Sequence, residues 1–189
     1  MRGVPALLGT QSGPKYVGGT VRDHAGGTIT VAYPDQAKPG DFALVMSSVT
    51  PSGFTLCGGS ITVHYKFLTS TDIANGVALG NNAVLAVYTG INAISNYRTY
   101  GDTAQSDPDY YPAPGFTKTA NSKFIIAICF NSGGSAPCTV TGFAARGFLS
   151  SAPCYYIGER KAESYVNGTD IAMGGSSNGR IYCDVYELL

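Results

Sequence analysis

Residues 71–90 read TDIANGVALGNNAVLAVYTG, and residues 164–188 read SYVNGTDIAMGGSSNGRIYCDVYEL. Both stretches contain an Asn-Gly turn, a short apolar strand, a turn rich in Gly and Asn, and an alternating strand that includes Val-Tyr. The shared order predicts two related β halves that close over one core.

The same order continues upstream of both stretches. In each half a long apolar strand is followed by a Gly-Phe turn and then by a second strand. The first half has Phe42–Val49, Gly53-Phe54-Thr55 and Ile61–Leu68, and the second half has Lys123–Phe130, Gly142-Phe143 and Cys154–Glu159. If the halves are equivalent, Val87 and Val185 both point into the core and Tyr88 and Tyr186 point outward.

The composition is that of one β domain with a sizeable core. The chain has 189 residues, of which 44% are hydrophobic, and 25 Gly and 10 Pro provide turns for many short strands. Only 13% of the residues are charged and the net charge is zero, which favours association between copies. The absence of a basic excess argues against a nucleic-acid-binding protein.

Period-2 alternation and short apolar runs predict roughly a dozen strands, and no amphipathic helix longer than two turns is expected. The predicted fold class is all-β, a two-sheet antiparallel β-sandwich of jelly-roll or immunoglobulin-like type with an internal pseudo-repeat. It occupies residues 16–189, after an N-terminal docking arm at 1–15. The predicted strands are Tyr16–Arg22, Thr28–Tyr33, Phe42–Val49, Ile61–Leu68, Val77–Leu79, Ala83–Tyr88, Lys123–Phe130, Thr139–Phe143, Cys154–Glu159, Ala162–Val166, Thr169–Met173 and Arg180–Glu187.

The five cysteines lack the spacing of a zinc site, and we expect them to be free thiols. A hairpin disulfide between Cys129 and Cys138 is the alternative. No signal peptide and no membrane-spanning segment is expected, because no apolar run is long enough.

The segment 38–93 resembles a β-sandwich domain that recurs among virion structural proteins of tailed bacteriophages. The motifs that resemble it are Gly40-Asp41 before an apolar strand, the Pro-x-Gly-aromatic-Thr turn, the Val-x-Tyr-Lys strand and a strand that ends in Tyr-x-Gly. They are found at Gly40-Asp41, Pro51–Thr55, Val63–Lys66 and Tyr88–Gly90. The family's usual Gly-Trp is Gly53-Phe54 in this chain. The resemblance implies a structural role in a tail tip, fibre or capsid surface, and it implies no catalytic residues.

The sequence does not point to catalysis. A nucleophile–base pair needs a histidine within hydrogen-bond reach, and the two histidines, His24 and His64, are expected in a turn and on the solvent face of a strand. The carboxylates are scattered, and no pair is singled out for glycoside hydrolysis. We therefore expect no enzyme activity, no cofactor and no bound metal, with a calcium site at Asp102, Asp107 and Asp109 as a minor alternative.

The segment 96–116, NYRTYGDTAQSDPDYYPAPGF, is expected to be a long loop without strands, and such loops are often functional. It concentrates aromatic residues, which are frequent at interface hot spots. A subunit contact, a receptor or glycan contact and local packing all remain open as its role. The candidate contact residues are Tyr97, Arg98, Tyr100, Asp107, Asp109, Tyr110 and Tyr111.

Together these observations predict a non-enzymatic structural subunit of a tailed-phage virion, made in the host cytoplasm. A tail-tip or tail-fibre-associated protein is the first expectation. A capsid decoration protein, of the cement or head-fibre kind, and a carbohydrate-binding module are the alternatives. The expected partners are other virion proteins and further copies of the chain, with a host surface glycan as a further candidate. Neither nucleic-acid binding nor membrane insertion is expected.

Overall fold

The protein is nearly all β. The computed structural model describes residues 13–23, 26–58, 62–101, 111–113, 116–131, 139–149, 154–169, 171–174 and 181–189. Strands make up 52% of the structure and helices 7%, which confirms the predicted all-β class. The helical elements of the described residues are α1 (Ser70–Asn75) and the short 3-10 helix η1 (Ala162–Ser164).

The first half of the chain builds a five-stranded antiparallel sheet. Its order is β1-β7-β3-β5-β4, formed by β1 (Lys15–Arg22), β7 (Ala83–Thr89), β3 (Phe42–Met46), β5 (Val63–Phe67) and β4 (Thr55–Leu56). Every residue of β3 and β7 is buried. The nearly continuous apolar runs of these strands are therefore explained by burial of both faces of the sheet.

The second half builds another five-stranded antiparallel sheet, in the order β12-β13-β10-β15-β8. Its strands are β12 (Ala144–Leu149), β13 (Cys154–Lys161), β10 (Phe124–Asn131), β15 (Ile181–Leu188) and β8 (Ile94–Gly101).

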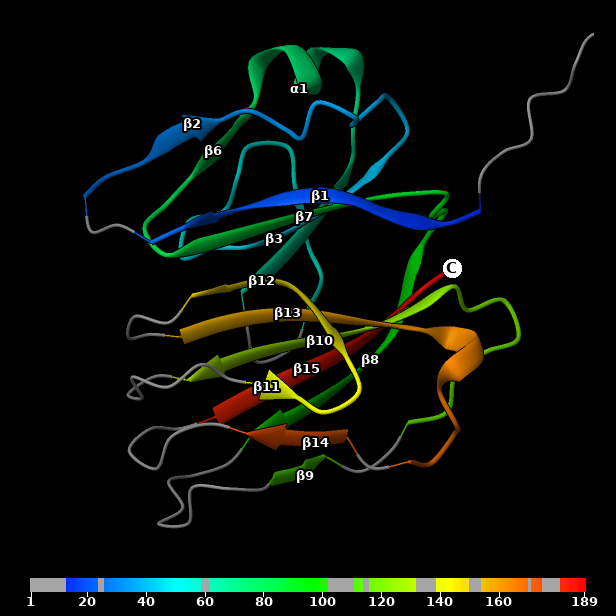
Figure 1. Ribbon diagram of the computed structural model, residues 1–189. Helices are drawn as coiled ribbons and strands as arrows, with labels where there is room; N and C mark the ends of the chain where they lie inside the picture. The colour runs from blue at the N-terminus through cyan, green and yellow to red at the C-terminus, as the bar shows by residue number, and fades with distance from the viewer. Residues whose placement is uncertain are drawn as a thin grey trace, which may run out of the picture.

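Two smaller sheets cover the outer faces of the large ones, which the sequence did not predict. Sheet β2-β6 and α1 lie against the first large sheet, and sheet β11-β14-β9 lies against the second, so that four layers follow one another from top to bottom of Figure 1. The strands of the smaller sheets are β2 (Ile29–Val31), β6 (Val77–Leu79), β11 (Thr139–Val140), β14 (Ile171–Gly174) and β9 (Tyr111–Ala113).

Three clusters of buried apolar side chains lie between these layers. The central cluster joins the two large sheets and includes Phe42, Leu44 and Tyr88 from one, with Ile126 and Tyr186 from the other. A second cluster lies between the first large sheet and β2-β6, and a third between the second large sheet and β11-β14-β9. The two halves are therefore joined by a shared apolar core.

The two large sheets have the same strand order. Read backwards, the order of the second sheet is β8-β15-β10-β13-β12, and that of the first is β1-β7-β3-β5-β4. Position by position, β8 corresponds to β1, β15 to β7, β10 to β3, β13 to β5 and β12 to β4. In this matching, the strands of both sheets follow one another in the same order along the chain. The matched pairs β2-β6 and β9-β14 are also neighbours in the small sheets.

Local features match as well. Gly53 and Gly142 both have positive φ, and the Phe after each donates its backbone N–H to the carbonyl three residues earlier, Phe54 to Pro51 at 3.2 Å and Phe143 to Val140 at 3.1 Å. Both β1 and β8 contain a bulge opposite the Val-Tyr step of the neighbouring strand. The two halves thus share these local features, and the internal repeat stays a prediction.

The expected orientation of the Val-Tyr pairs is half correct. Val87 and Val185 are both fully buried, as expected, but Tyr88 and Tyr186 are buried too and lie in the central cluster. The valines instead belong to the two outer clusters. The prediction of outward tyrosines is wrong because a large sheet of this fold has no solvent-exposed face at its centre.

The expected strand over Ala162–Val166 is replaced by the helix η1. The ammonium of Lys118 donates to the carbonyl oxygens of Ala162 and Tyr165, and the Tyr165 hydroxyl accepts the backbone N–H of Phe116 at 3.0 Å. These contacts fold the segment over the edge of the sheet, where the aromatic rings of Phe116 and Tyr165 pack together.

The segment expected to be a loop without strands, 96–116, contains strand residues at both ends. Residues 94–101 form β8 and pair along their length with β15, and residues 111–113 form β9 and pair with β14. Tyr alternates with polar residues at the start of this segment, a pattern typical of an edge strand. The pattern was missed because the residues that follow it in the sequence are typical of turns.

The two large sheets approach each other closely where β12 lies near β1 and β7. A Cβ atom at Gly147 of β12 would lie 2.4 Å from Cγ1 of Val84 and 3.4 Å from Cγ2 of Val21. Because real Cβ atoms do not approach carbon that closely, only glycine fits between the two halves at this position.

We predict that Gly147→Ala destabilises the protein by roughly 1–3 kcal/mol, the usual effect of overpacking a core. Urea unfolding followed by circular dichroism measures the change. Gly13→Ala is the control, since nothing lies within 4 Å of its Cβ position. Equal stability of the Gly147 variant and the wild type would show that the halves do not touch there.

Candidate functional site

Three of the candidate contact residues belong to an outer strand. Tyr97, Arg98 and Tyr100 lie in β8, which ends the second large sheet. The backbone of β8 pairs with β15 on one side, for example Arg98 with Val185, and pairs with no other strand of the described structure. A strand at a sheet edge presents unpaired N–H and C=O groups, which another chain can bind by adding a strand.

The remaining candidates are only partly placed. Tyr111 is the first residue of β9, the outer strand of the small sheet over the same half. Asp107, Asp109 and Tyr110 lie outside the described residues, as does most of the expected docking arm at 1–15, although Lys15 already belongs to β1. The structure thus connects the segment that contains these candidates to two outer strands of one half.

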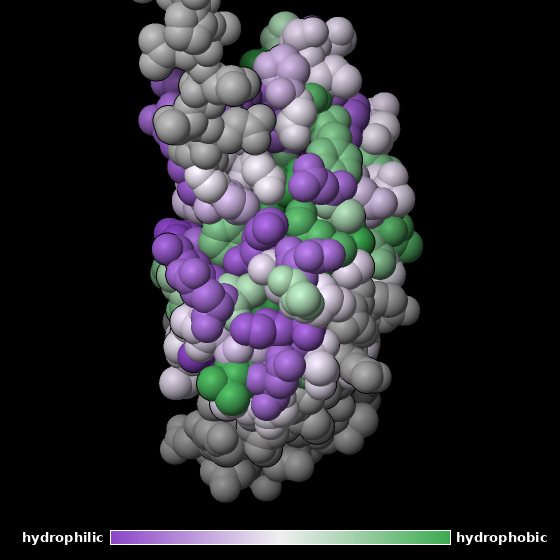
Figure 2. Space-filling view, turned by 90° about the vertical axis from the view of Figure 1, so that its right-hand side faces the viewer, coloured by the Kyte–Doolittle hydropathy of each residue, from purple (hydrophilic) through white to green (hydrophobic). Residues whose placement is uncertain are grey.

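A second surface of interest is the end of the molecule where β1 begins and β13 ends. It has two shallow hollows. The larger, of about 360 Å³, is lined by Pro14, Ser122, Lys123, Phe124, Lys161 and Glu163. The smaller, of about 190 Å³, is lined by Lys15, Val17, Gln36, Lys38, Asp41 and Thr89. Figure 2 shows this face, on which hydrophilic residues are interspersed with hydrophobic ones.

We call Lys15, Lys38, Lys123 and Lys161 the lysine face. All four side chains are exposed. In the described structure the only ion pair among them joins Lys161 to Glu163, at 3.8 Å and with both side chains largely exposed. Such a pair contributes little. Sequence reasoning missed this surface, because its lysines are far apart in the chain.

Two of the scattered carboxylates, those of Glu159 and Glu187, are buried and connect separate parts of the fold. Glu187 is fully buried and accepts hydrogen bonds from the N–H and hydroxyl of Thr119, both at 2.6 Å, and from the hydroxyls of Ser122 and Ser95. These contacts attach the connection before β10 to the second large sheet.

Glu159 forms an ion pair with Arg146, whose pKa is raised chiefly by the hydrogen bond to this carboxylate. The Arg146 guanidinium lies 4.6 Å from the ring centre of Tyr16, and the Tyr16 hydroxyl donates to the carbonyl of Arg146 at 3.0 Å. The cluster therefore connects β1 of the first half with β12 and β13 of the second.

The described histidine, His64, lies in the interior of the protein. His64 was expected on a solvent face, but this prediction is wrong: the side chain is buried, and burial lowers its pKa. Its Nε2 lies 3.1 Å from the hydroxyl of Thr50. The contact joins the strand to the neighbouring turn.

The thiol prediction is supported for Cys57 and Cys183, which are free thiols. Burial raises the pKa of Cys57 to about 12, so this thiol stays protonated near neutral pH. Cys138 lies outside the described residues.

Within the described ranges, no three His, Cys, Asp or Glu side chains are grouped so that they could hold a metal ion. In the same ranges, no helix is long and apolar enough to cross a membrane.

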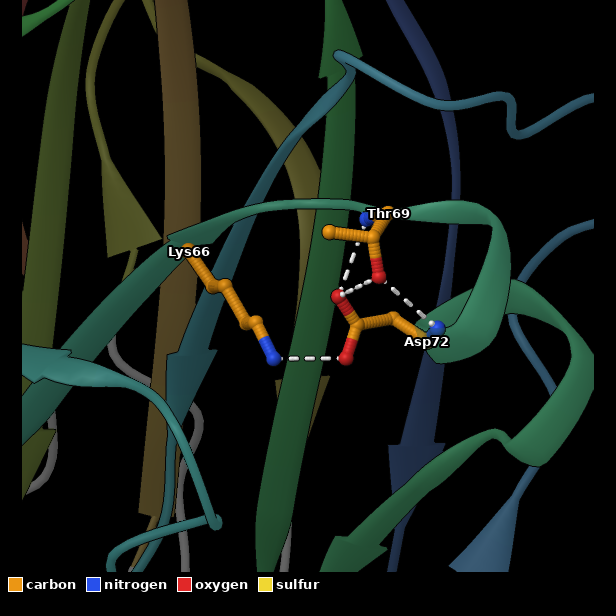
Figure 3. A network of polar contacts seen from close by, with 3 residues as sticks. All are labelled: Lys66, Thr69 and Asp72. Atoms are coloured by element: carbon orange, nitrogen blue, oxygen red, sulfur yellow. Dashed lines mark hydrogen bonds and ion pairs between the residues drawn. The ribbon is translucent and has the colours of Figure 1, made fainter.

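A network of polar contacts in the first half caps the N-terminus of α1 (Figure 3). The carboxylate of Asp72 accepts the backbone N–H of Thr69 at 2.9 Å and its hydroxyl at 2.7 Å, and the Asp72 N–H donates to the Thr69 hydroxyl at 3.2 Å. Lys66, from the end of β5, pairs with the same carboxylate at 2.5 Å. This capping box satisfies N–H groups that a helix leaves unpaired at its start.

Burial alone would raise the pKa of Asp72, but the hydrogen bonds from Lys66 and Thr69 outweigh it and leave the pKa below its ordinary value. The network is thus a structural cap, and it gives the described first half a pH-sensitive contact.

Comparison of the chain with models of protein families, with curated proteins and with solved structures finds no match. The resemblance to phage virion proteins rests on the sequence motifs.

We predict that Asp72→Asn lowers the free energy of unfolding at pH 7 by roughly 0.5–2 kcal/mol, the usual value of a helix cap. Because the folded-state pKa of Asp72 is depressed, its contribution is present above the unfolded-state value and is lost as the pH falls through the folded-state pKa. The difference between variant and wild type, measured by urea unfolding, should therefore shrink in acid. Asp35→Asn, the same change at an exposed position outside α1, is the control. A pH-independent difference would show that the ionised carboxylate is not what matters.

Proposed function

We propose that this protein is a non-enzymatic structural subunit of a tailed-phage particle, built from two copies of one β unit. A tail-tip or fibre-associated position is the first assignment within the particle. Its contacts are with neighbouring copies and with other virion proteins.

The observation that supports the proposal best is the position of the resemblance motifs in the fold. Gly40-Asp41 directly precedes β3, Pro51–Thr55 forms the turn into β4, Val63–Lys66 lies in β5, and Tyr88–Gly90 ends β7. The motifs therefore lie within or directly beside the strands of one sheet.

The local structure explains why these residue types are needed. Gly40 adopts positive φ, and the Asp41 carboxylate accepts the Lys38 N–H at 3.0 Å. This tight turn leads directly into the fully buried strand β3. The motifs are thus determined by folding, which is consistent with a family whose shared residues are structural.

The surface also suits a subunit of an assembly. The net charge is zero, so copies repel one another little. The outer strand β8 offers an unpaired backbone edge eight residues long.

Quantitative mass spectrometry of purified particles from the phage that encodes this chain tests the proposal. The chain should be present, with few copies if it belongs to the tail and hundreds if it decorates the capsid. Its absence from purified particles would contradict the proposal. Binding of the isolated protein to a glycan array would then favour the carbohydrate-binding alternative.

We predict that changing Tyr110 and Tyr111 together to Ser leaves the β-type circular dichroism spectrum intact but lowers incorporation into particles, because aromatic anchors dominate many interfaces. Val49→Ser with Val166→Ser is the control, since both valines are exposed elsewhere on the surface. Normal incorporation of the tyrosine variant would move the subunit contact away from this segment.

A further inference from the structure

The charges of the described structure are divided between its interior and its surface, although the chain has no net charge. Several of the described acids lie in the interior, namely Asp41, Glu159, Asp184 and Glu187. Another, Asp72, pairs with Lys66. The four lysines of the lysine face, by contrast, are all exposed. The surface at this end of the molecule is therefore more basic than the composition indicates.

The strand registers bring these lysines to one end of both large sheets. In the first sheet, Lys15 begins β1 and Lys38 lies in the turn that leads into β3. In the second sheet, Lys161 ends β13 and pairs with Phe124, the residue after Lys123. The lysine face is thus a product of the fold, formed by strand ends from both halves of the chain.

The two hollows of the lysine face adjoin each other and keep an excess of positive charge. Pro14 lines the larger and Lys15 lines the smaller, so the hollows meet at the start of β1. Their linings contain two carboxylates. That of Asp41 is 2% exposed and accepts the backbone N–H of Lys38. That of Glu163 lies 3.8 Å from the Lys161 ammonium, in an exposed pair that contributes little.

The chemistry of this face does not suit a folded protein or a peptide. Lysine is depleted in protein interfaces, whose usual anchors are aromatic residues and arginine. The aromatic residue of the two linings, Phe124, is 3% exposed, and no arginine is among their described residues. An extended peptide adds to the free edge of a sheet, whereas this face is formed by strand ends.

Nucleic acid and a membrane surface fit the lysine face no better. Single strands stack on exposed aromatic rings, and a nucleic-acid-binding domain carries an overall basic excess, which this chain lacks. Anionic membranes are usually bound by an amphipathic helix or by a basic cluster beside a membrane-spanning helix. Within the described ranges the α-helix is the six-residue α1, and no helix is long and apolar enough to span a membrane.

We infer that the lysine face binds an acidic polysaccharide, whose carboxylate or sulfate groups pair with the lysines. The lysine ammonium is a hydrated point charge on a flexible stem, so it pairs with an anionic group without a fixed geometry. A polymer engages the lysines of both hollows at once, which strengthens binding beyond that of a single sugar. Gln36, exposed beside the smaller hollow, adds hydrogen bonds to sugar hydroxyls.

This site goes beyond the proposed function and does not depend on it. It is also separate from the segment 96–116, which contains the candidate contact residues. Because its contacts join exposed charges, salt weakens them.

Isothermal titration calorimetry of the purified protein with polygalacturonate, dextran sulfate and neutral dextran tests the inference, at about 20 mM and about 200 mM salt. We expect at least one of the two acidic polymers to bind at low salt, more weakly at high salt, and neutral dextran not to bind. The two acidic polymers distinguish a preference for carboxylate from one for sulfate.

Matched variants locate the site. Lys123→Gln with Lys161→Gln, and separately Lys15→Gln with Lys38→Gln, should each weaken binding about tenfold, as the loss of two exposed charge pairs would. Lys123→Arg with Lys161→Arg keeps the charges and should bind like the wild type. Val49→Glu with Thr62→Glu changes the net charge as much as either glutamine variant, at exposed positions beyond the other ends of β3 and β5, and should also bind like the wild type.

Three results would overturn the inference. One is that neither acidic polysaccharide binds, or that neutral dextran binds as well as they do. Another is that both glutamine variants, with wild-type circular dichroism spectra, bind as tightly as the wild type. The third is tighter binding of polyglutamate or duplex DNA than of either acidic polysaccharide, which would assign the lysine face to a protein or nucleic-acid partner.

Discussion

The packing of the two large sheets against each other is the contact on which the other features of the fold depend. Tyr88 and Tyr186 occupy matching positions in β7 and β15, and both are buried between the sheets. Each large sheet therefore has one face against its partner and the other against its own small sheet. This arrangement explains why the central strands are apolar on both faces, and it agrees with the low share of charged residues, 13%.

A core of this kind must accommodate the few polar groups that it buries. Glu187 does so by accepting hydrogen bonds from Thr119, Ser122 and Ser95 at the second large sheet, and Glu159 does so by pairing with Arg146 between the halves. Removing one member of such a pair leaves the other desolvated, which usually costs more than the pair contributes. The buried acids thus secure the connections between the layers, while the exposed lysines at the end of the molecule remain available for other contacts.

Much of the fold follows from the sequence, and the failures have physical reasons. The apolar runs and Gly turns correctly placed β3, β5, β6, β7, β10, β13 and β15. Periodicity could not show that Tyr88 is buried, because alternation separates two faces of a strand without saying which is covered. His64 was misplaced for the same reason. The helix α1 was missed because six residues show no clear helical period, and β8 because its Tyr residues adjoin a turn-rich segment. The lysine face was missed because it arises from strand ends that only the fold brings together.

The central claim is that the two halves form one cooperative unit through the core between the large sheets. Native-state hydrogen exchange, followed by mass spectrometry, measures the free energy of opening for the amides of each strand. The account predicts the same free energy for the central strands β3 and β7 as for β10 and β15, equal to that of global unfolding. A markedly lower value for either half, with the other half still protected, would show that each half is stable alone and would contradict the account.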